Sequence, residues 1–310
     1  MTLCRLIEII TPKKYVLNGL WFGSLQAKKA IICLHGLGSN MFSNHAFLLP
    51  LVQDDTAVLV FNNRGHDDIA SIKKIDQRKK RGFVKIEAGA AKEVFVECAD
   101  DIQGAIKTAK AQGAQQVFLL GHSTGCQKSV YYMSKKHTQS DIAGVILLSP
   151  MSDYAGAKHL TPPNELDVAT RTAQQYVKNG KPHDLLPSSV WPEVVDAQRF
   201  LSLYTPKSDE EVFSYAHPED VPHSLHRLKV PTLVVLAEKD EYRDRSIKKI
   251  ATWFATHLHI SKAKVEIISR ANHSFFGNES DVVTRIQSWM RFIPFPLDSK
   301  NRNNTSKKNA

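Results

Sequence analysis

Cysteine is scarce and dispersed in this chain, which argues against a disulfide scaffold and against a zinc site built from paired cysteines. The four cysteines among the 310 residues are Cys4, Cys33, Cys98 and Cys126. None forms a C-x-x-C pair, and three of them fall inside apparent strands or helices. This spacing indicates reduced, mostly buried thiols, as is typical of a reducing compartment.

Long apolar runs are missing as well. No segment is apolar over the length that a helix needs to span a bilayer. The first residues, MTLCRLIEIITPKKY, are interrupted by Arg5 and Glu8, and they lack the continuous apolar core and the cleavage site of a secretory signal. We therefore expect a cytoplasmic protein without a membrane span.

Acidic residues are outnumbered by basic ones, 31 against 41, which gives a net charge of +10. Part of this excess lies in KNRNNTSKKNA at the C-terminus, and we expect residues 294–310 to form a disordered basic tail. A second part lies at 73–85, with seven cations and one acid. No nucleic-acid-binding motif accompanies the charge, so specific nucleic-acid binding is not expected.

Metal ligands at useful spacing are also lacking. His66, Asp67 and Asp68 are adjacent, but no further ligand pair accompanies them. We expect neither a metal nor a cofactor.

Apolar runs alternate with helical patterns along most of the chain. Runs such as KAIICLHG, TAVLVFNNRG, QQVFLLG, IAGVILLSP and VPTLVVLAEKD predict strands, and several are apolar without alternation, as in strands covered on both faces. Helical spacing separates them, for example at 97–112 and 245–258. This order predicts an α/β fold with a mostly parallel, doubly wound sheet.

One stretch interrupts the alternation. Residues 151–229 contain helical patterns and several prolines but no convincing strand. We expect a core formed by 1–150 and 230–293, with 151–229 inserted as a helical cap over the carboxyl edge of the sheet. A structural excursion far from any site remains the alternative.

The most informative segment is QQVFLLGHSTG at 115–125, which a helical pattern follows. A strand followed by G-x-S-x-G and a helix is the arrangement of a nucleophile elbow, in which a tight turn exposes the serine oxygen. Glycine is needed on both sides because a side chain there would clash. A plain turn is the alternative interpretation.

Four segments together resemble the α/β-hydrolase fold family over nearly all of residues 3–293. They are HGLGS at 35–39, GHSTG at 121–125, LAEKDEY at 236–242 and ANHSFF at 271–276. The order of serine, acid and histidine is that of the family. The residues around these motifs also resemble a branch of the family that includes siderophore esterases.

The resemblance implies roles for individual residues. Ser123 would be the nucleophile, His273 the general base and Asp240 the acid that orients the histidine. Asp240 follows the apolar run LVVLA, at the end of a predicted strand. Other carboxylates remain alternatives for the acid: Asp153, Glu238, Glu241 and Asp244.

The resemblance also implies an oxyanion hole made by the backbone N–H groups of Leu37 and Thr124. Glycines flank these two segments: Gly36, Gly38, Gly121 and Gly125. An ordinary glycine turn is the alternative for HGLGS. We expect His122 and Cys126 to pack beside the site without a chemical role.

The expected activity is that of a serine hydrolase, foremost a carboxylic-ester hydrolase acting on a small molecule. The alternatives are thioesterase, amidase, peptidase or lyase chemistry in the same fold, or a non-catalytic relative that only binds a ligand. The sequence does not predict the oligomeric state. The basic segment 73–85 is expected to be a loop. If Arg78, Lys79, Lys80 and Arg81 reach the rim of the site, they would favour anionic substrates; otherwise they form a solvated surface.

Overall fold

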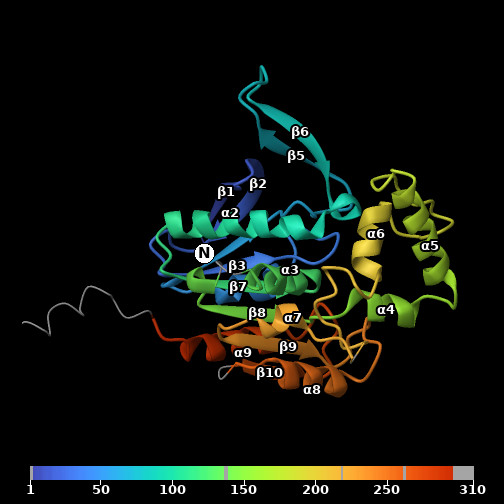
Figure 1. Ribbon diagram of the computed structural model, residues 1–310. Helices are drawn as coiled ribbons and strands as arrows, with labels where there is room; N and C mark the ends of the chain where they lie inside the picture. The colour runs from blue at the N-terminus through green and yellow to red at the C-terminus, as the bar shows by residue number, and fades with distance from the viewer. Residues whose placement is uncertain (1–2, 136–138, 218, 261–262, 296–310) are drawn as a thin grey trace, which may run out of the picture.

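The computed structural model describes residues 3–295 except 136–138, 218 and 261–262. The part of the predicted tail 294–310 that follows Phe295 lies outside the described residues. A single sheet forms its centre (Figure 1). The strands are β1 (Cys4–Ile10), β2 (Tyr15–Phe22), β3 (Lys29–Leu34), β4 (Thr56–Phe61), β5 (Ala70–Ile75), β6 (Phe83–Ala88), β7 (Gln116–His122), β8 (Gly144–Leu148), β9 (Thr232–Ala237) and β10 (Ala263–Ile268).

The helices follow the strands in alternation along much of the chain. They are α1 (His45–Leu48), α2 (Cys98–Ala111), α3 (Thr124–Met133), α4 (Asp153–Leu160), α5 (Glu165–Lys178), α6 (Ala197–Tyr204), α7 (His223–His226), α8 (Ile247–His257) and α9 (Glu279–Arg291). Short 3₁₀ turns are η1 (Leu49–Leu51), η2 (Ala90–Lys92), η3 (Phe95–Glu97) and η4 (Gln139–Asp141). In the described part of the chain, none of the helices has the length and apolarity to cross a membrane.

The sheet is mostly parallel, as the sequence predicts. Its order is β10-β9-β8-β7-β3-β4-β2-β5-β6, with β1 paired to β2. The pairs from β10 across to β4 are parallel, whereas β2 runs antiparallel to β4, to β1 and to β5. Parallel strands end at the same edge of a sheet, so the loops that follow β3, β7 and β9 gather on one side.

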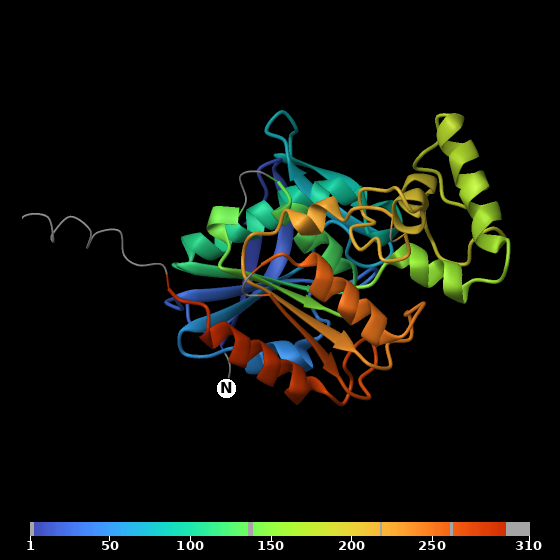
Figure 2. The same ribbon diagram turned by 60° about the horizontal axis from the view of Figure 1, so that its bottom comes forward.

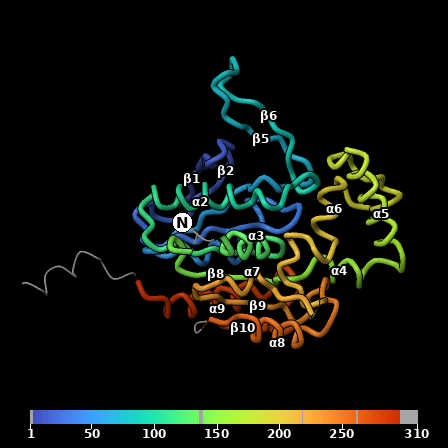
Figure 3. The backbone as a smooth tube through the Cα atoms, viewed as in Figure 1, coloured from blue at the N-terminus to red at the C-terminus, as the bar shows by residue number. Residues whose placement is uncertain are grey.

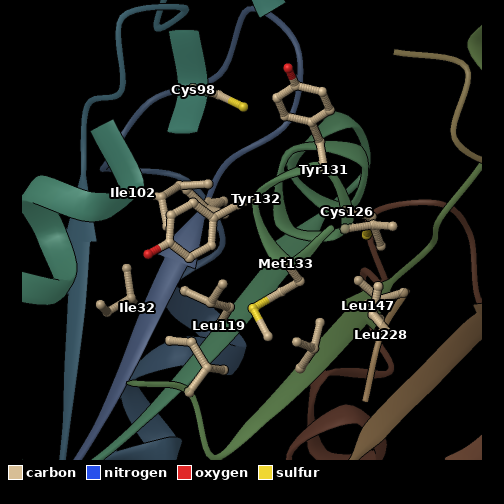
Figure 4. Packing of buried hydrophobic residues seen from close by; sticks show 14 of the residues in the cluster. Ile32, Cys98, Ile102, Leu119, Cys126, Tyr131, Tyr132, Met133, Leu147 and Leu228 are labelled. Carbon is tan, nitrogen blue, oxygen red and sulfur yellow. The ribbon is translucent and has the colours of Figure 1, made fainter. Parts of the chain in front are cut away.

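Helices cover both faces of the sheet, and the residues of each strand divide between them. In β3, Ile32 packs into the cluster covered by α2, α3 and α8, whereas Ile31 packs into the cluster covered by α1 and α9. Figure 4 shows Ile32 and Leu119 of the sheet beneath Ile102 of α2 and Met133 of α3. This two-sided burial explains the apolar runs without alternation.

The helices α4, α5 and α6 form a separate group at one end of the sheet (Figures 1 and 2). Helices α5 and α6 share an apolar cluster that includes Trp191, Phe200 and Tyr204. Val212, Phe213, Tyr215, Leu225 and Leu228 pack instead in the main core. Residues of the segment 151–229 therefore contribute to two apolar clusters.

Residues 73–85 are only partly the predicted loop, because 73–75 end β5, 83–85 begin β6 and the loop is confined to 76–82. Strands β5 and β6 pair antiparallel from Ala70 opposite Ala88 to Ile75 opposite Phe83. They form a hairpin that projects from the body of the molecule, away from α4–α6 (Figures 1 and 3). The two strands carry Ile72, Ile75, Val84 and Ile86, but the dense charge around these residues obscured the strand pattern.

A buried ion network joins α3 to the helical group. The Lys128 ammonium on α3 lies 2.7 Å from Glu93 Oε1, and Arg199 Nη2 on α6 lies 3.1 Å from Glu93 Oε2. Arg199 also pairs with Glu210. These side chains are at most 3% exposed. Burial alone would raise the pKa of Glu93, but Lys128 and Arg199 outweigh it and hold that pKa below its ordinary value.

Removing the charge of Glu93 should destabilise the fold. We expect Glu93→Gln to lower the free energy of unfolding by about 3 kcal/mol, because Lys128 is then buried without a counter-charge. Urea unfolding at pH 7 measures this change. The control is Glu87→Gln, which removes a surface pair with Lys92 and should change stability by less than about 0.5 kcal/mol. Equal unfolding midpoints for the two variants would contradict the prediction.

Candidate active site

Ser123 occupies the turn between β7 and α3 in a strained backbone conformation, with φ 55° and ψ −127°. The turn is tight because the strand and the helix approach closely. A Cβ on Gly121 would lie 2.3 Å from the carbonyl oxygen of Gly125, and a Cβ on Gly125 would lie 2.2 Å from that of Leu34. Both positions therefore require glycine, as expected for an elbow that presents the serine at its tip.

Asp240 and His273 come together behind this turn. His273 Nδ1 lies 2.7 Å from Asp240 Oδ2, and both residues are buried. The second carboxylate oxygen, Oδ1, accepts the backbone N–H of Tyr242 at 3.0 Å. A carboxylate only accepts here, so Nδ1 carries the proton and Nε2 of His273 is left as the acceptor.

The other acidic candidates have different partners. Glu238 accepts hydrogen bonds from Ser269 and the backbone of Arg270, and Asp244 pairs with Arg245. Asp153 Oδ2 accepts from the Gln127 amide at 2.6 Å. Within the described ranges, Asp240 is the only one of the five candidates whose carboxylate contacts the imidazole of His273.

The backbone of His273 is anchored by three side chains, and the sequence did not predict this role for any of them. Its N–H donates to Glu241 Oε2 at 2.9 Å, and its carbonyl accepts from His122 Nε2 at 3.0 Å and from Ser149 Oγ at 2.9 Å. Burial lowers the pKa of His122 to about 4, so His122 is neutral near pH 7 and donates through Nε2. No local pattern marks these residues, because each bond joins distant parts of the chain.

Two backbone N–H groups lie beside Ser123 without partners. Thr124 is the first residue of α3, where the helix leaves its N–H unused, and Leu37 lies in the loop after β3. Neither group donates a hydrogen bond within the part of the chain that the structure describes. The loop passes close to the nucleophile, since a Cβ on Gly36 would lie 3.5 Å from Ser123 Oγ. Such free donors suit a developing oxyanion.

Ser123 and His273 open into one cavity of about 810 Å³, which Leu37 and Tyr242 also line. Its far wall comes from the helical group, including Leu160 of α4 and Leu203 of α6.

The basic cluster of Arg78, Lys79, Lys80 and Arg81 does not line this cavity. It lies at the tip of the β5–β6 hairpin, between the two strands, which agrees with the alternative of a solvated surface and not with a position at the rim. Among the described residues, no group of three His, Cys, Asp or Glu could hold a metal ion.

Asp153, on the cavity wall, should make stability depend on pH. Burial, aided by the charge of Glu210, raises the pKa of Asp153 to about 7, whereas an unfolded aspartate titrates near ~3.9. Between these values the folded state binds more protons, so this group lowers stability as pH rises. We expect Asp153→Asn to be more stable than the wild type by on the order of 3 kcal/mol at pH 8, and to gain little at pH 4.5. Urea unfolding at both pH values measures the difference; an equal gain at both would contradict it.

Comparisons with known proteins identify solved structures that are similar to this fold. An esterase from Pyrococcus furiosus is 17% identical, with a TM-score of 0.60 and coverage of 94% of this chain and 92% of that one. A siderophore hydrolase from Aspergillus fumigatus is 15% identical, with a TM-score of 0.61 and coverage of 90% and 95%. A dienelactone hydrolase from Anabaena variabilis is 14% identical, with a TM-score of 0.54 and coverage of 94% and 99%. None of the curated proteins matches the chain significantly.

These similarities extend over nearly the whole chain, but identities at this level carry the fold alone. The fold they share with this chain is the α/β-hydrolase fold, as the sequence resemblance predicts. A family described as "Protein of unknown function (DUF1749)" matches residues 95–291. Because that match spans more than half of the chain, the protein belongs to this family.

Proposed function

We propose that this protein is a serine hydrolase that cleaves small carboxylic esters through an acyl-enzyme on Ser123. The observation that carries the proposal is the pairing of His273 Nδ1 with Asp240, on the wall of the cavity into which Ser123 opens. The pairing leaves Nε2 of His273 as a base inside that cavity. The unpartnered N–H groups of Leu37 and Thr124 support the same chemistry.

The proposed reaction has two halves. Nε2 of His273 takes the proton of Ser123 Oγ while Oγ bonds to the ester carbonyl carbon, and the carbonyl oxygen becomes an oxyanion facing Leu37 and Thr124. The tetrahedral intermediate collapses, the C–O bond to the alcohol breaks, and His273 passes its proton to the leaving oxygen. Water then repeats the sequence on the acyl-enzyme and releases the acid. Asp240 stabilises the imidazolium in both halves.

Esters are favoured as substrates because two of the similar structures are an esterase and a siderophore hydrolase by name. Thioesters and amides could be cleaved by the same residues, and substrate panels distinguish them. The four cysteines are free thiols, three of them buried, which supports a reducing compartment such as the cytoplasm.

Loss of the nucleophile gives the first functional prediction. A fluorophosphonate probe should label the wild type at Ser123, as peptide mass spectrometry will show. Ser123→Ala should keep its circular dichroism spectrum, lose labelling and lose ester turnover by ~10⁶ in kcat. Undiminished labelling of this variant would refute the assignment.

Loss of the orienting acid gives the second functional prediction. We expect Asp240→Asn to lower kcat by on the order of 10⁴, because an amide no longer holds His273 in the required tautomer. The matched control is Glu238→Gln, which alters an exposed carboxylate at the end of the same strand and should change turnover little. If Asp240→Asn kept more than about a tenth of wild-type turnover, the acid would have to lie elsewhere.

A further inference from the structure

The cavity has a charge opposite to that of the protein. The chain carries 41 lysines and arginines and a net charge of +10. Among the described residues, none of the lysines and arginines lines the cavity of about 810 Å³, whereas three carboxylates do: Asp68, Asp153 and Glu193. The Asp, Glu, Lys and Arg residues that line the cavity are therefore all acidic.

The three carboxylates lack a counter-charge of their own. Asp153 Oδ2 accepts from the amide of Gln127 at 2.6 Å, and Glu193 Oε2 accepts from the hydroxyl of Tyr204 at 2.7 Å. Both donors are neutral. No ion pair involves Asp68, Asp153 or Glu193 among residues that the structure describes. Neutral donors hold Asp153 and Glu193 in place without supplying a counter-charge; Asp68 and Glu193 are exposed to solvent, whereas Asp153 is half-buried.

A buried cation close to this wall is already engaged, because Arg199 on α6 pairs with Glu93 and Glu210. Burial is the main cause of the raised pKa of Asp153; the charges of Glu210 and Glu193 add to it, and Arg199 opposes it. A cation bound in the cavity would remove that penalty.

Aromatic side chains complete this wall. Trp191, Tyr204 and Tyr242 line the cavity together with Asp153 and Glu193. Trp191 and Tyr204 pack against each other with ring centroids 5.0 Å apart, so this part of the wall is well defined. Aromatic rings next to carboxylates suit an ammonium group with an apolar surround, because the cation gains from both.

We propose that the ester substrate carries a positively charged ammonium group, and that Asp153 and Glu193 bind this group beside the Trp191–Tyr204 wall. The proposal rests on the hydrolase function proposed above and specifies its substrate class. The same carboxylates would repel a substrate with a carboxylate or phosphate, which reverses the preference suggested by the basic segment.

The test uses two pairs of esters that differ only in charge. Butyrylcholine is compared with 3,3-dimethylbutyl butyrate, in which carbon replaces the ammonium nitrogen of the alcohol. Methyl 6-aminohexanoate is compared with methyl heptanoate, which tests the acyl side. For at least one pair we expect kcat/KM to be about tenfold or more higher for the cationic ester.

Substitutions in the cavity wall test whether its carboxylates cause the preference for cationic esters. The double change Asp153→Asn and Glu193→Gln should bring the cationic-to-neutral ratio of kcat/KM close to one. The matched control, Asp167→Asn, removes an exposed carboxylate of α5 that does not line the cavity and should leave the ratio as in the wild type.

Labelling of Ser123 by an uncharged fluorophosphonate distinguishes failure of the proposed substrate class from failure of the proposed hydrolase function. A protein that is labelled but shows no preference for either cationic ester, or turns over neither, overturns the substrate class alone. A preference that survives the double change overturns the role of Asp153 and Glu193. A protein that is not labelled overturns the hydrolase function itself.

Discussion

The close approach of β3, β7 and α3 is the constraint on which the site depends. Because Gly125 lies against the carbonyl of Leu34, the helix starts directly behind the strands and the turn at Ser123 has no room to relax. The strain at φ 55° is held by this packing and not by the turn itself. It directs the serine into the cavity and leaves the N–H of Thr124 beside it. Rigid elements thus prepare the geometry before any substrate binds.

The buried ion network extends this rigidity to the opposite wall. Lys128 belongs to the helix that begins at the nucleophile, and Arg199 belongs to α6, so Glu93 between them links the two sides of the cavity. Removing one partner of such a buried network leaves an uncompensated buried charge, which is costly. The network therefore couples the helical group to the helix that begins at Ser123.

The surface of this protein and the wall of its cavity differ in the sign of their charge. The surface excess of cations includes the projecting β5–β6 hairpin, whereas the cavity wall is acidic. Net charge describes how the molecule attracts others at long range, and the field inside a narrow cavity depends on the few groups that line it. The overall charge balance therefore does not describe the field inside the cavity.

The sequence by itself determined the strand–helix order, the mostly parallel sheet and the segments that carry Ser123, Asp240 and His273. Periodicity and glycine spacing are local properties, and they report local structure. Tertiary structure alone decided the rest. It separated Asp240 from Asp153 as the partner of His273, and it brought Glu241 and Ser149 to the backbone of that histidine. It also turned the basic segment into a hairpin remote from the cavity and placed Glu193 on the cavity wall. These results depend on contacts between residues far apart in the chain, and no pattern within one segment encodes such contacts.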